Sequence, residues 1–186
     1  KIFITGGAGY IGSELINYLL EDGYEVRVLD NLMYEKTSLL RYSSHEKFTF
    51  IKADVRNKNI LKEELDNCDV IIPLAALVGF PLCDDHPRDA EEINYEINDW
   101  IAQNKRDDQK VIYPCTNSGY GKSSDGVCTE ESPLNPVSLY GVTKVRAEES
   151  FRKVENHVTF RLATVYGPSS RMRADLLVNN FVWRSL

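Results

Sequence analysis

The fold is decided near the start of the chain by the stretch Ile2-Phe3-Ile4-Thr5-Gly6-Gly7-Ala8-Gly9-Tyr10-Ile11-Gly12. An apolar run at 2–4 leads directly into a glycine-rich turn, and residues with helical spacing follow. Gly7 and Gly9 allow a tight turn and close approach of the backbone to a phosphate, and Gly12 allows the helix to pack closely on the strand. The N-terminus of that helix would direct free N–H groups and its positive dipole end at the phosphate. The stretch therefore predicts the strand, turn and helix of a dinucleotide site.

The next predicted strand ends in an acid. The helix before it is expected to bury Ile11, Leu15 and Leu19, which are spaced by four residues. The strand at 25–29 then leads to Asp30, 18 residues after the last glycine of the turn. A carboxylate at this place can accept hydrogen bonds from both hydroxyls of an adenosine ribose, and it would repel a 2′-phosphate. The spacing therefore favours NAD over NADP.

The composition limits the classes of protein that fit. The 186 residues suit one α/β domain that is long enough to bury a core. The net charge of −6, without a basic patch, argues against a nucleic-acid partner. No apolar run approaches the length of a membrane span and no signal peptide is visible, so a cytoplasmic location and no membrane partner are expected. The four cysteines lack metal-type spacing and are expected to be reduced thiols, and the scattered histidines predict no metal site.

Strands and helices alternate along the rest of the chain. Further strands are predicted at 48–51, 70–72, 111–113 and 158–162, helices at about 88–104 and 140–154, and a long loop at 117–138. Strands separated by helical stretches predict a parallel, doubly wound sheet, the Rossmann fold of the α/β class. Ligands of such sheets bind at the carboxyl ends of the strands.

A second motif, Tyr140-Gly141-Val142-Thr143-Lys144, predicts acid/base chemistry. Tyr140 and Lys144 are four residues apart on one helix and share a face. A free tyrosine has a pKa of about 10, and the ammonium of Lys144 together with an oxidised nicotinamide would lower it. Tyr140 would then remove a proton from a substrate hydroxyl while hydride leaves the same carbon. Thr116 ends a strand 24 residues upstream, where its hydroxyl could hydrogen-bond the same oxygen. The pattern YxxxK is common in helices, and its position after a dinucleotide motif is what favours the catalytic interpretation.

These motifs resemble the extended short-chain dehydrogenase/reductase superfamily, in its NAD-dependent nucleotide-sugar epimerase/dehydratase family, over nearly the whole chain. The turn at 5–12 matches TGGxGxIG of that branch, and Thr116, Tyr140 and Lys144 match its catalytic triad. The resemblance implies NAD as cofactor and a nucleotide-diphosphate sugar as substrate. The cofactor-binding residues that it implies are Gly6, Gly9, Tyr10, Ile11, Gly12, Asp30, Asn31, Asp54, Val55, Leu74, Ala75, Ala76, Asn94, Tyr140 and Lys144. The substrate-binding residues that it implies are Thr116, Asn117, Thr164, Arg171 and Arg173.

Departures from the family pattern narrow the expected reaction. Relatives that are 4,6-dehydratases usually carry an acid directly after the catalytic threonine, whereas this chain has Asn117-Ser118. Thr164 stands where many relatives have an asparagine that contacts the nucleotide diphosphate. The sequence therefore favours an NAD-dependent epimerase, with a sugar dehydrogenase or reductase as the alternative and the 4,6-dehydratase third. A non-catalytic NAD-binding protein is the alternative of another class, and the retained triad argues against it.

The resemblance also predicts the domain organisation and an oligomer. Residues 1–168 would form the NAD-binding Rossmann domain, and 169–186 would begin a C-terminal substrate-binding region that is largely absent from this chain. Arg171 and Arg173 would be the first contacts of that region to an anionic ligand, or else solvated arginines of a loop. A homodimer is expected through the helices at 88–104 and 140–154. Trp100 is then the apolar residue expected to reach a partner, unless the whole stripe serves the monomer core.

Overall fold

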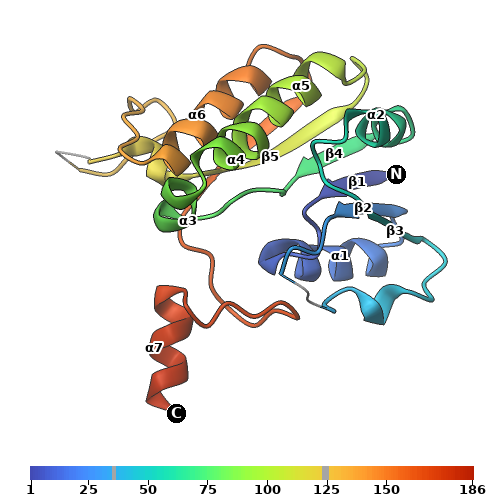
Figure 1. Cartoon of the computed structure of the whole chain (residues 1–186), viewed down its shortest axis with the longest axis horizontal. Coiled ribbons are helices and arrows are strands. Elements are labelled where there is room, and N and C mark those ends of the chain that lie inside the picture. The colour runs from blue at the N-terminus through green and yellow to red at the C-terminus, as the bar shows by residue number, and fades with distance from the viewer. Residues whose placement is uncertain (35–36, 123–125) are drawn as a thin grey trace.

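A six-stranded parallel sheet forms the centre of the computed structural model, which describes residues 1–34, 37–122 and 126–186 (Figure 1). The strands are β1 (Ile2–Thr5), β2 (Val26–Asp30), β3 (Phe48–Lys52), β4 (Val70–Pro73), β5 (Lys110–Thr116) and β6 (His157–Leu162). Their order across the sheet is β3-β2-β1-β4-β5-β6, and each neighbouring pair is parallel. This is the doubly wound Rossmann order, and it confirms the predicted fold class. The order reverses between β1 and β4, where such sheets bind their ligands.

The helical elements occur between the strands, as the alternation predicts. They are α1 (Tyr10–Glu21), the short 3₁₀ turn η1 (Leu40–Tyr42), α2 (Lys58–Asp66), α3 (Phe80–Asp85), α4 (Pro87–Glu91), the π-helical turn η2 (Glu92–Glu96), α5 (Ile97–Asn104), the 3₁₀ turn η3 (Asn117–Tyr120), α6 (Leu139–Phe151) and α7 (Leu177–Ser185). The helix predicted at 88–104 is thus α4, η2 and α5 in succession. Part of the predicted loop at 117–138 is η3, and residues 123–125 of that prediction lie outside the described residues.

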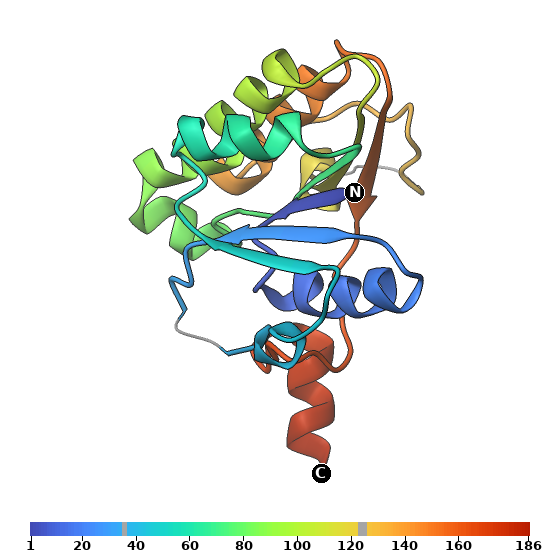
Figure 2. The same cartoon turned by 90° about the vertical axis from the view of Figure 1, so that its right-hand side faces the viewer.

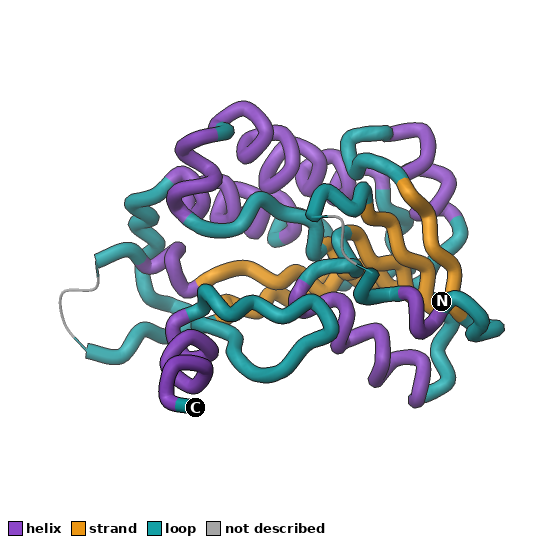
Figure 3. Tube along the Cα trace, turned by 60° about the horizontal axis from the view of Figure 1, so that its bottom comes forward, coloured by secondary structure: helices purple, strands orange, loops and turns teal. Residues whose placement is uncertain are grey.

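Helices cover both faces of the sheet (Figures 2 and 3). On one face, α1 and η1 pack over an apolar cluster that includes Ile4, Ile16 and Val28. On the other face, α2, α4, η2, α5 and α6 cover a second cluster, in which the rings of Tyr113 and Phe151 lie 4.9 Å apart. No helix among the described residues is long and apolar enough to cross a membrane.

The buried face of α1 differs from the prediction by one position. Gly12, Ser13, Ile16 and Leu20 are buried, whereas Leu15 and Leu19 are partly buried and Ile11 lines a cavity. Close packing at the start of the helix explains why its buried face is shifted by one residue. A Cβ on Gly12 would lie 2.6 Å from the Cα of Gly7, so the helix face that begins at Gly12 is the one that packs against the turn.

The role expected for Gly7 also differs. A Cβ on Gly7 would lie 2.6 Å from Cγ1 of Val28, and Gly7 does not line the cavity. Its lack of a side chain therefore lets the turn and α1 pack on β2. Gly9, which lines the cavity, is instead the glycine whose backbone can approach a ligand closely.

The chain after β6 returns to the N-terminus of α1. Ser169 Oγ donates to the carbonyl oxygen of Tyr10 at 2.8 Å, and Asn179 Nδ2 donates to the Tyr10 hydroxyl at 3.0 Å. Asn179 Oδ1 also accepts the backbone N–H of Gly167 at 2.9 Å. These bonds hold residues 167–180 beside α1, and α7 projects away from the sheet (Figure 2). The domain boundary at residue 168 stays a prediction.

Candidate functional site

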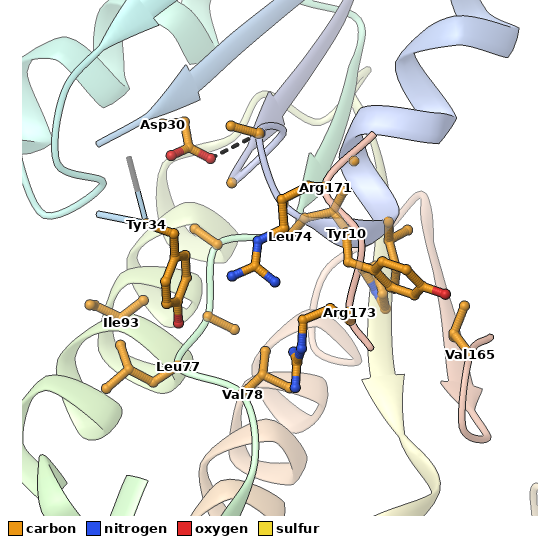
Figure 4. A pocket seen from close by; sticks show the side chains of 18 of the residues that line it. Tyr10, Asp30, Tyr34, Leu74, Leu77, Val78, Ile93, Val165, Arg171 and Arg173 are labelled. Atoms are coloured by element: carbon orange, nitrogen blue, oxygen red, sulfur yellow. Dashed lines mark hydrogen bonds between the residues drawn. The ribbon is translucent and has the colours of Figure 1, made fainter. Parts of the chain in front are cut away.

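A cavity of about 370 Å³ lies at the carboxyl ends of the six strands (Figure 4). Its volume is within the range of small-molecule sites, and it lies where the strand order reverses. The turn between β1 and α1 forms one wall. The ends of β2 and β3 form the second, and β5, α6 and the segment after β6 form the third.

The glycine turn brings backbone close to the cavity. Gly6 has a φ of +71°, and a Cβ there would lie 2.5 Å from the backbone nitrogen of Ala75, so only glycine allows the turn to meet the loop after β4. A Cβ on Gly9 would contact only the Gly6 oxygen, at 3.1 Å among the described atoms, and would otherwise project into the cavity. Because α1 begins at Tyr10, its first N–H groups face the same space. This turn fits a phosphate group of a dinucleotide.

Asp30 is oriented by the backbone on either side of it. Its Oδ2 accepts the N–H of Ala8 at 3.0 Å, and its Oδ1 accepts the N–H of Leu32 at 2.8 Å (Figure 4). Leu32 itself adopts a left-handed φ of +57°. Each carboxylate oxygen keeps further acceptor capacity toward the cavity, as contacts to ribose hydroxyls require.

Arg56 holds the carboxylate of Asp54 at the same end of the cavity. The Nε and the backbone N–H of Arg56 donate to Asp54 Oδ1, both at 2.9 Å, and its Nη2 donates to Oδ2 at 2.8 Å. Its Nη1 also donates to Asp89 and Glu92, at 2.7 and 2.9 Å, and so ties the loop after β3 to α4 and η2. The hydrogen bonds from Arg56 lower the pKa of Asp54 below its usual value, which keeps the carboxylate ionised.

Thr116, Tyr140 and Lys144 line the opposite part of the cavity. Thr116 ends β5, and its Oγ1 accepts the N–H of Ser118 at 3.1 Å. The side chain of Ser138 caps α6 by accepting the N–H of Gly141 at 3.1 Å. This cap starts the helix at Leu139 and places Tyr140 and Lys144 in its first two turns. The structure thus brings the three residues of the predicted triad to one wall.

Burial is the largest influence on the pKa of Tyr140. Burial raises it to about 12, and hydrogen bonding to Thr116 and the positive charge of Arg173 offset only part of that effect. Burial also lowers the pKa of Lys144 to about 8. The sequence predicts a lower pKa for Tyr140 when Lys144 and an oxidised nicotinamide act together, and this remains a prediction.

Lys144 is almost completely buried, with 4% of its surface exposed. Its Nζ lies 4.2 Å from the ring centroid of Tyr113, a side chain of β5 that is itself fully buried. An ammonium over an aromatic face is stabilised by the ring quadrupole. The position of Lys144 beneath the cavity is therefore set by packing as well as by its place on α6.

Fourteen of the fifteen residues expected to bind cofactor line the cavity, and Asn94 does not. Asn94 is fully buried, where its Oδ1 accepts the N–H of Leu77 at 2.9 Å and its Nδ2 donates to the Leu77 oxygen at 3.0 Å. It therefore supports the loop after β4 from behind. Its Nδ2 also donates to Thr143 Oγ1 at 3.5 Å, so the amide of Asn94 is engaged away from the cavity.

The expected substrate residues Asn117, Thr164, Arg171 and Arg173 also line the cavity. Three contributing residues were missed by the sequence interpretation. Arg56 follows Asp54 by two residues and had a local signal, because short-range Asp–Arg pairs are common on loops. Tyr113 and Tyr34 had none, since their contacts depend on packing between distant segments. The described residues contain no group of three or more His, Cys, Asp or Glu side chains that could hold a metal ion.

A Rossmann sheet whose glycine turn, acidic strand end and Thr–Tyr–Lys group line one cavity defines a protein of the short-chain dehydrogenase/reductase type. More specifically, the chain belongs to the NAD dependent epimerase/dehydratase family, whose family model matches residues 2–183. This confirms the resemblance stated from the motifs.

Some individual relatives are named epimerases and others dehydratases. The chain is 30% identical over 175 residues to a putative UDP-glucose 4-epimerase of Methanocaldococcus jannaschii, a match that covers 89% of this chain and 56% of the relative. It is 31% identical to an uncharacterized UDP-glucose epimerase, YtcB, of Bacillus subtilis, covering 100% of this chain and 62% of that one. A crystal structure of a double mutant of DesIV, a dTDP-glucose 4,6-dehydratase of Streptomyces venezuelae with NAD bound, superposes with a TM-score of 0.87 at 28% identity and covers 100% of this chain and 62% of that chain. The chain thus spans between 56% and 62% of these three relatives.

Proposed function

We propose that this chain is the NAD-binding part of a nucleotide-sugar epimerase that oxidises a sugar hydroxyl transiently and returns hydride. One observation carries the proposal. Thr116, Tyr140 and Lys144, from β5 and α6, line the same cavity as the glycine turn and Asp30. A proton-transfer group is thus placed beside a dinucleotide cradle, as a redox reaction at a sugar carbon requires.

The residues that line the cavity support NAD as its ligand. The turn at Gly6 and Gly9 and the start of α1 would hold the diphosphate, and Asp30 would accept the adenosine ribose hydroxyls. Asn31, Asp54 and Val55 line the adenine side, and the loop at 74–76 lines the wall toward the triad. When bound in its oxidised form, NAD accepts hydride from the sugar carbon and contributes a positive charge that favours a tyrosine phenolate.

The chain's own residues would control the proton of the sugar hydroxyl. With a pKa of about 12, the Tyr140 hydroxyl is protonated at neutral pH and is ready to donate to a keto oxygen. In the oxidising direction it must lose that proton, so its pKa must fall when ligands bind. Thr116, on the same wall, already acts in that direction by lowering the pKa of Tyr140. Lys144, with a pKa of about 8, is mostly charged at neutral pH and would stabilise the phenolate.

The distribution of acids in the cavity supports hydride chemistry over elimination of water. Among the described residues that line it, only Asp30 and Asp54 are acidic, and both lie at the adenosine end. Asn117 and Ser118, directly after the catalytic threonine, also line the cavity and carry no ionisable group. An elimination needs a positioned acid at the reacting carbon. This observation supports our preference for the epimerase over the 4,6-dehydratase, despite the likeness to a dehydratase structure.

A sugar dehydrogenase or reductase is the second candidate, because it needs the same triad and the same cofactor. The two differ in what happens to hydride. An epimerase returns it to the sugar and leaves the cofactor unchanged, whereas a dehydrogenase accumulates NADH.

The test is to incubate the protein, with whatever sequence follows Leu186 in its gene, with NAD and a panel of UDP-, dTDP- and GDP-sugars. Products are followed by NMR and NADH by absorbance. We expect interconversion of two epimeric nucleotide sugars without net NADH. Stoichiometric NADH would identify the dehydrogenase, and a 4-keto-6-deoxy product would identify the dehydratase. Failure of every sugar with a preparation that binds NAD would favour the non-catalytic alternative.

A further inference from the structure

We propose that Arg171 binds the diphosphate of the cofactor, and that Tyr34 holds its guanidinium group in place for this. The inference rests on the proposed function in taking NAD as the ligand. It changes the assignment of Arg171, which the sequence places among the substrate residues, to the cofactor end of the cavity.

The two arginines after β6 occupy different surroundings. The Arg171 guanidinium carbon lies 4.4 Å from the ring centroid of Tyr34, in the segment that directly follows β2 and Asp30. Arg173 forms an ion pair with Asp175 at 2.5 Å, and its charge acts on Tyr140 at the catalytic end. Figure 4 shows Arg171 beside Tyr34, and Arg173 nearer to Val78. Arg171 is thus grouped with the adenosine wall and Arg173 with the triad.

Arg171 is chemically unsatisfied in a way that Arg173 is not. Its Nε is buried and has no hydrogen-bond partner among the described residues. The described carboxylates include none in ion-pair contact with Arg171, whereas Arg173 has Asp175. A buried N–H of a cation without an acceptor is costly, and an anionic oxygen would remove that cost. The described part of the chain thus supplies no acceptor for Arg171 Nε, and an anion in the cavity would supply one.

The backbone at Arg171 is anchored to the helix that would bind the diphosphate. Ser169 Oγ donates to the Tyr10 oxygen at 2.8 Å and accepts the N–H of Arg171 at 3.1 Å. The neighbouring Ser170 N–H donates to Glu14 of α1 at 2.7 Å. The N-terminus of α1 carries positive partial charge, and the guanidinium group of Arg171 lines the same cavity. Two positive groups at one end of a cavity favour a ligand with adjacent negative charges, and a diphosphate is such a ligand.

Tyr34 gives the arginine its direction. A guanidinium group stacked on an aromatic ring loses rotational freedom and keeps its edge N–H groups available for planar contacts to phosphate oxygens. Asp30 ends β2 and would contact the adenosine ribose, and Tyr34 lies four residues after it in the chain. The stacking thus joins the segment after β6 to the cofactor half of the cavity.

The test is calorimetric titration of the protein with NAD, ADP and UDP. Arg171→Met keeps the apolar stem over Tyr34 and removes the charge, and Arg171→Lys keeps the charge. Arg173→Met is the matched variant two residues away. We expect Arg171→Met to weaken the binding of NAD and ADP by about tenfold or more. Both ligands carry a diphosphate, and the variant loses a charge-assisted hydrogen bond to it. Arg171→Lys should recover part of this loss, and Arg173→Met should weaken NAD less than Arg171→Met does. Far-UV circular dichroism and thermal melting check that each variant is folded.

Two results would overturn the inference alone. In the first, the wild-type protein binds NAD and Arg171→Met binds it within twofold. In the second, Arg171→Met weakens UDP but not NAD or ADP, which would return Arg171 to the nucleotide sugar. A wild-type protein that binds no NAD would overturn the proposed function, and the inference with it.

Discussion

The buried side chain of Tyr113 makes two contacts with Lys144, one through its ring and one through its hydroxyl. The Lys144 Nζ lies 4.2 Å from the centroid of the Tyr113 ring, and the Tyr113 hydroxyl donates to the Lys144 carbonyl oxygen at 3.3 Å. The ring holds the ammonium and the hydroxyl holds the helix turn that carries it. The position of the lysine in the triad thus depends on a side chain of β5 that does not line the cavity.

Two substitutions separate these contacts. Tyr113→Phe removes only the hydrogen bond, and we expect it to lower the free energy of unfolding by about 1 kcal/mol. Tyr113→Leu also removes the ring from Lys144 and Phe151, so we expect a larger loss, of roughly 2–4 kcal/mol. Urea denaturation measures both. Equal losses in the two variants would show that the ring contacts contribute nothing.

Lys144 should destabilise the fold at neutral pH. Burial lowers its pKa from 10.5 to about 8, so between these values the unfolded chain binds a proton that the folded chain does not. The contribution of Lys144 to the free energy of unfolding of the wild type therefore rises with pH between about 8 and 10.5. We expect Lys144→Met to raise the free energy of unfolding at pH 7 by roughly 1–3 kcal/mol.

The matched measurement compares both proteins by urea denaturation at pH 7 and pH 10, so that the other titrating groups cancel. The advantage of Lys144→Met should shrink at pH 10, because the wild-type lysine is then mostly neutral in the folded state. An advantage that stays constant with pH would contradict the lowered pKa of Lys144.

Tyr140→Phe keeps the ring and removes the ionisable hydroxyl. We expect it to abolish turnover of nucleotide sugar, a loss of at least a hundredfold, while NAD affinity stays within a few-fold. Lys144→Ala should reduce both, because the ammonium would also contact the bound cofactor. NMR of the sugar products measures turnover, and calorimetry measures NAD binding. Near wild-type turnover of Tyr140→Phe would refute the proposed role of the hydroxyl.

The homodimer through the helices at 88–104 and 140–154 remains a prediction. Ile93, Ile97 and Ile101 are buried in the monomer core, whereas Trp100 is partly exposed, with Lys58 Nζ 6.0 Å from its ring centroid. Trp100 is therefore the member of the stripe that is free to contact a partner. Trp100→Glu should shift a wild-type dimer to monomer in sedimentation velocity, because it puts a charge in an apolar interface. A wild-type protein that is monomeric at high concentration would rule the dimer out.

The six strands were predictable because each is a short apolar run beside turn residues, and a parallel sheet buries both of its faces. The helix α2 was missed although its signals exist. Asn57 caps it by accepting the N–H of Ile60, and Leu61 and Leu65, four residues apart, are its buried apolar residues. Its other residues are mostly charged, so the apolar pattern of this short helix is difficult to recognise in the sequence.

The parts of the site that depend on local sequence were also predictable. The glycine turn and Asp30 are fixed by short spacings, and the helix that carries Tyr140 and Lys144 brings them to one face. Contacts between distant segments were not, because they follow from the exact packing of β5 on α6 and of the segment after β6 on α1. The raised pKa of Tyr140 belongs to the same class, since burial cannot be read from the spacing of Tyr140 and Lys144.

The most direct test of the cofactor site compares NAD with NADP in calorimetric titrations of the wild type and of Asp30→Ala. Asp30 is held by the N–H groups of Ala8 and Leu32, so its carboxylate is fixed where the adenosine ribose would lie. We expect the wild type to bind NAD at least tenfold more tightly than NADP, because the carboxylate accepts the ribose hydroxyls and repels a 2′-phosphate. Asp30→Ala should weaken NAD binding and reduce the difference between the affinities for NAD and NADP. Equal or tighter binding of NADP by the wild type would contradict the assignment of the cavity to NAD.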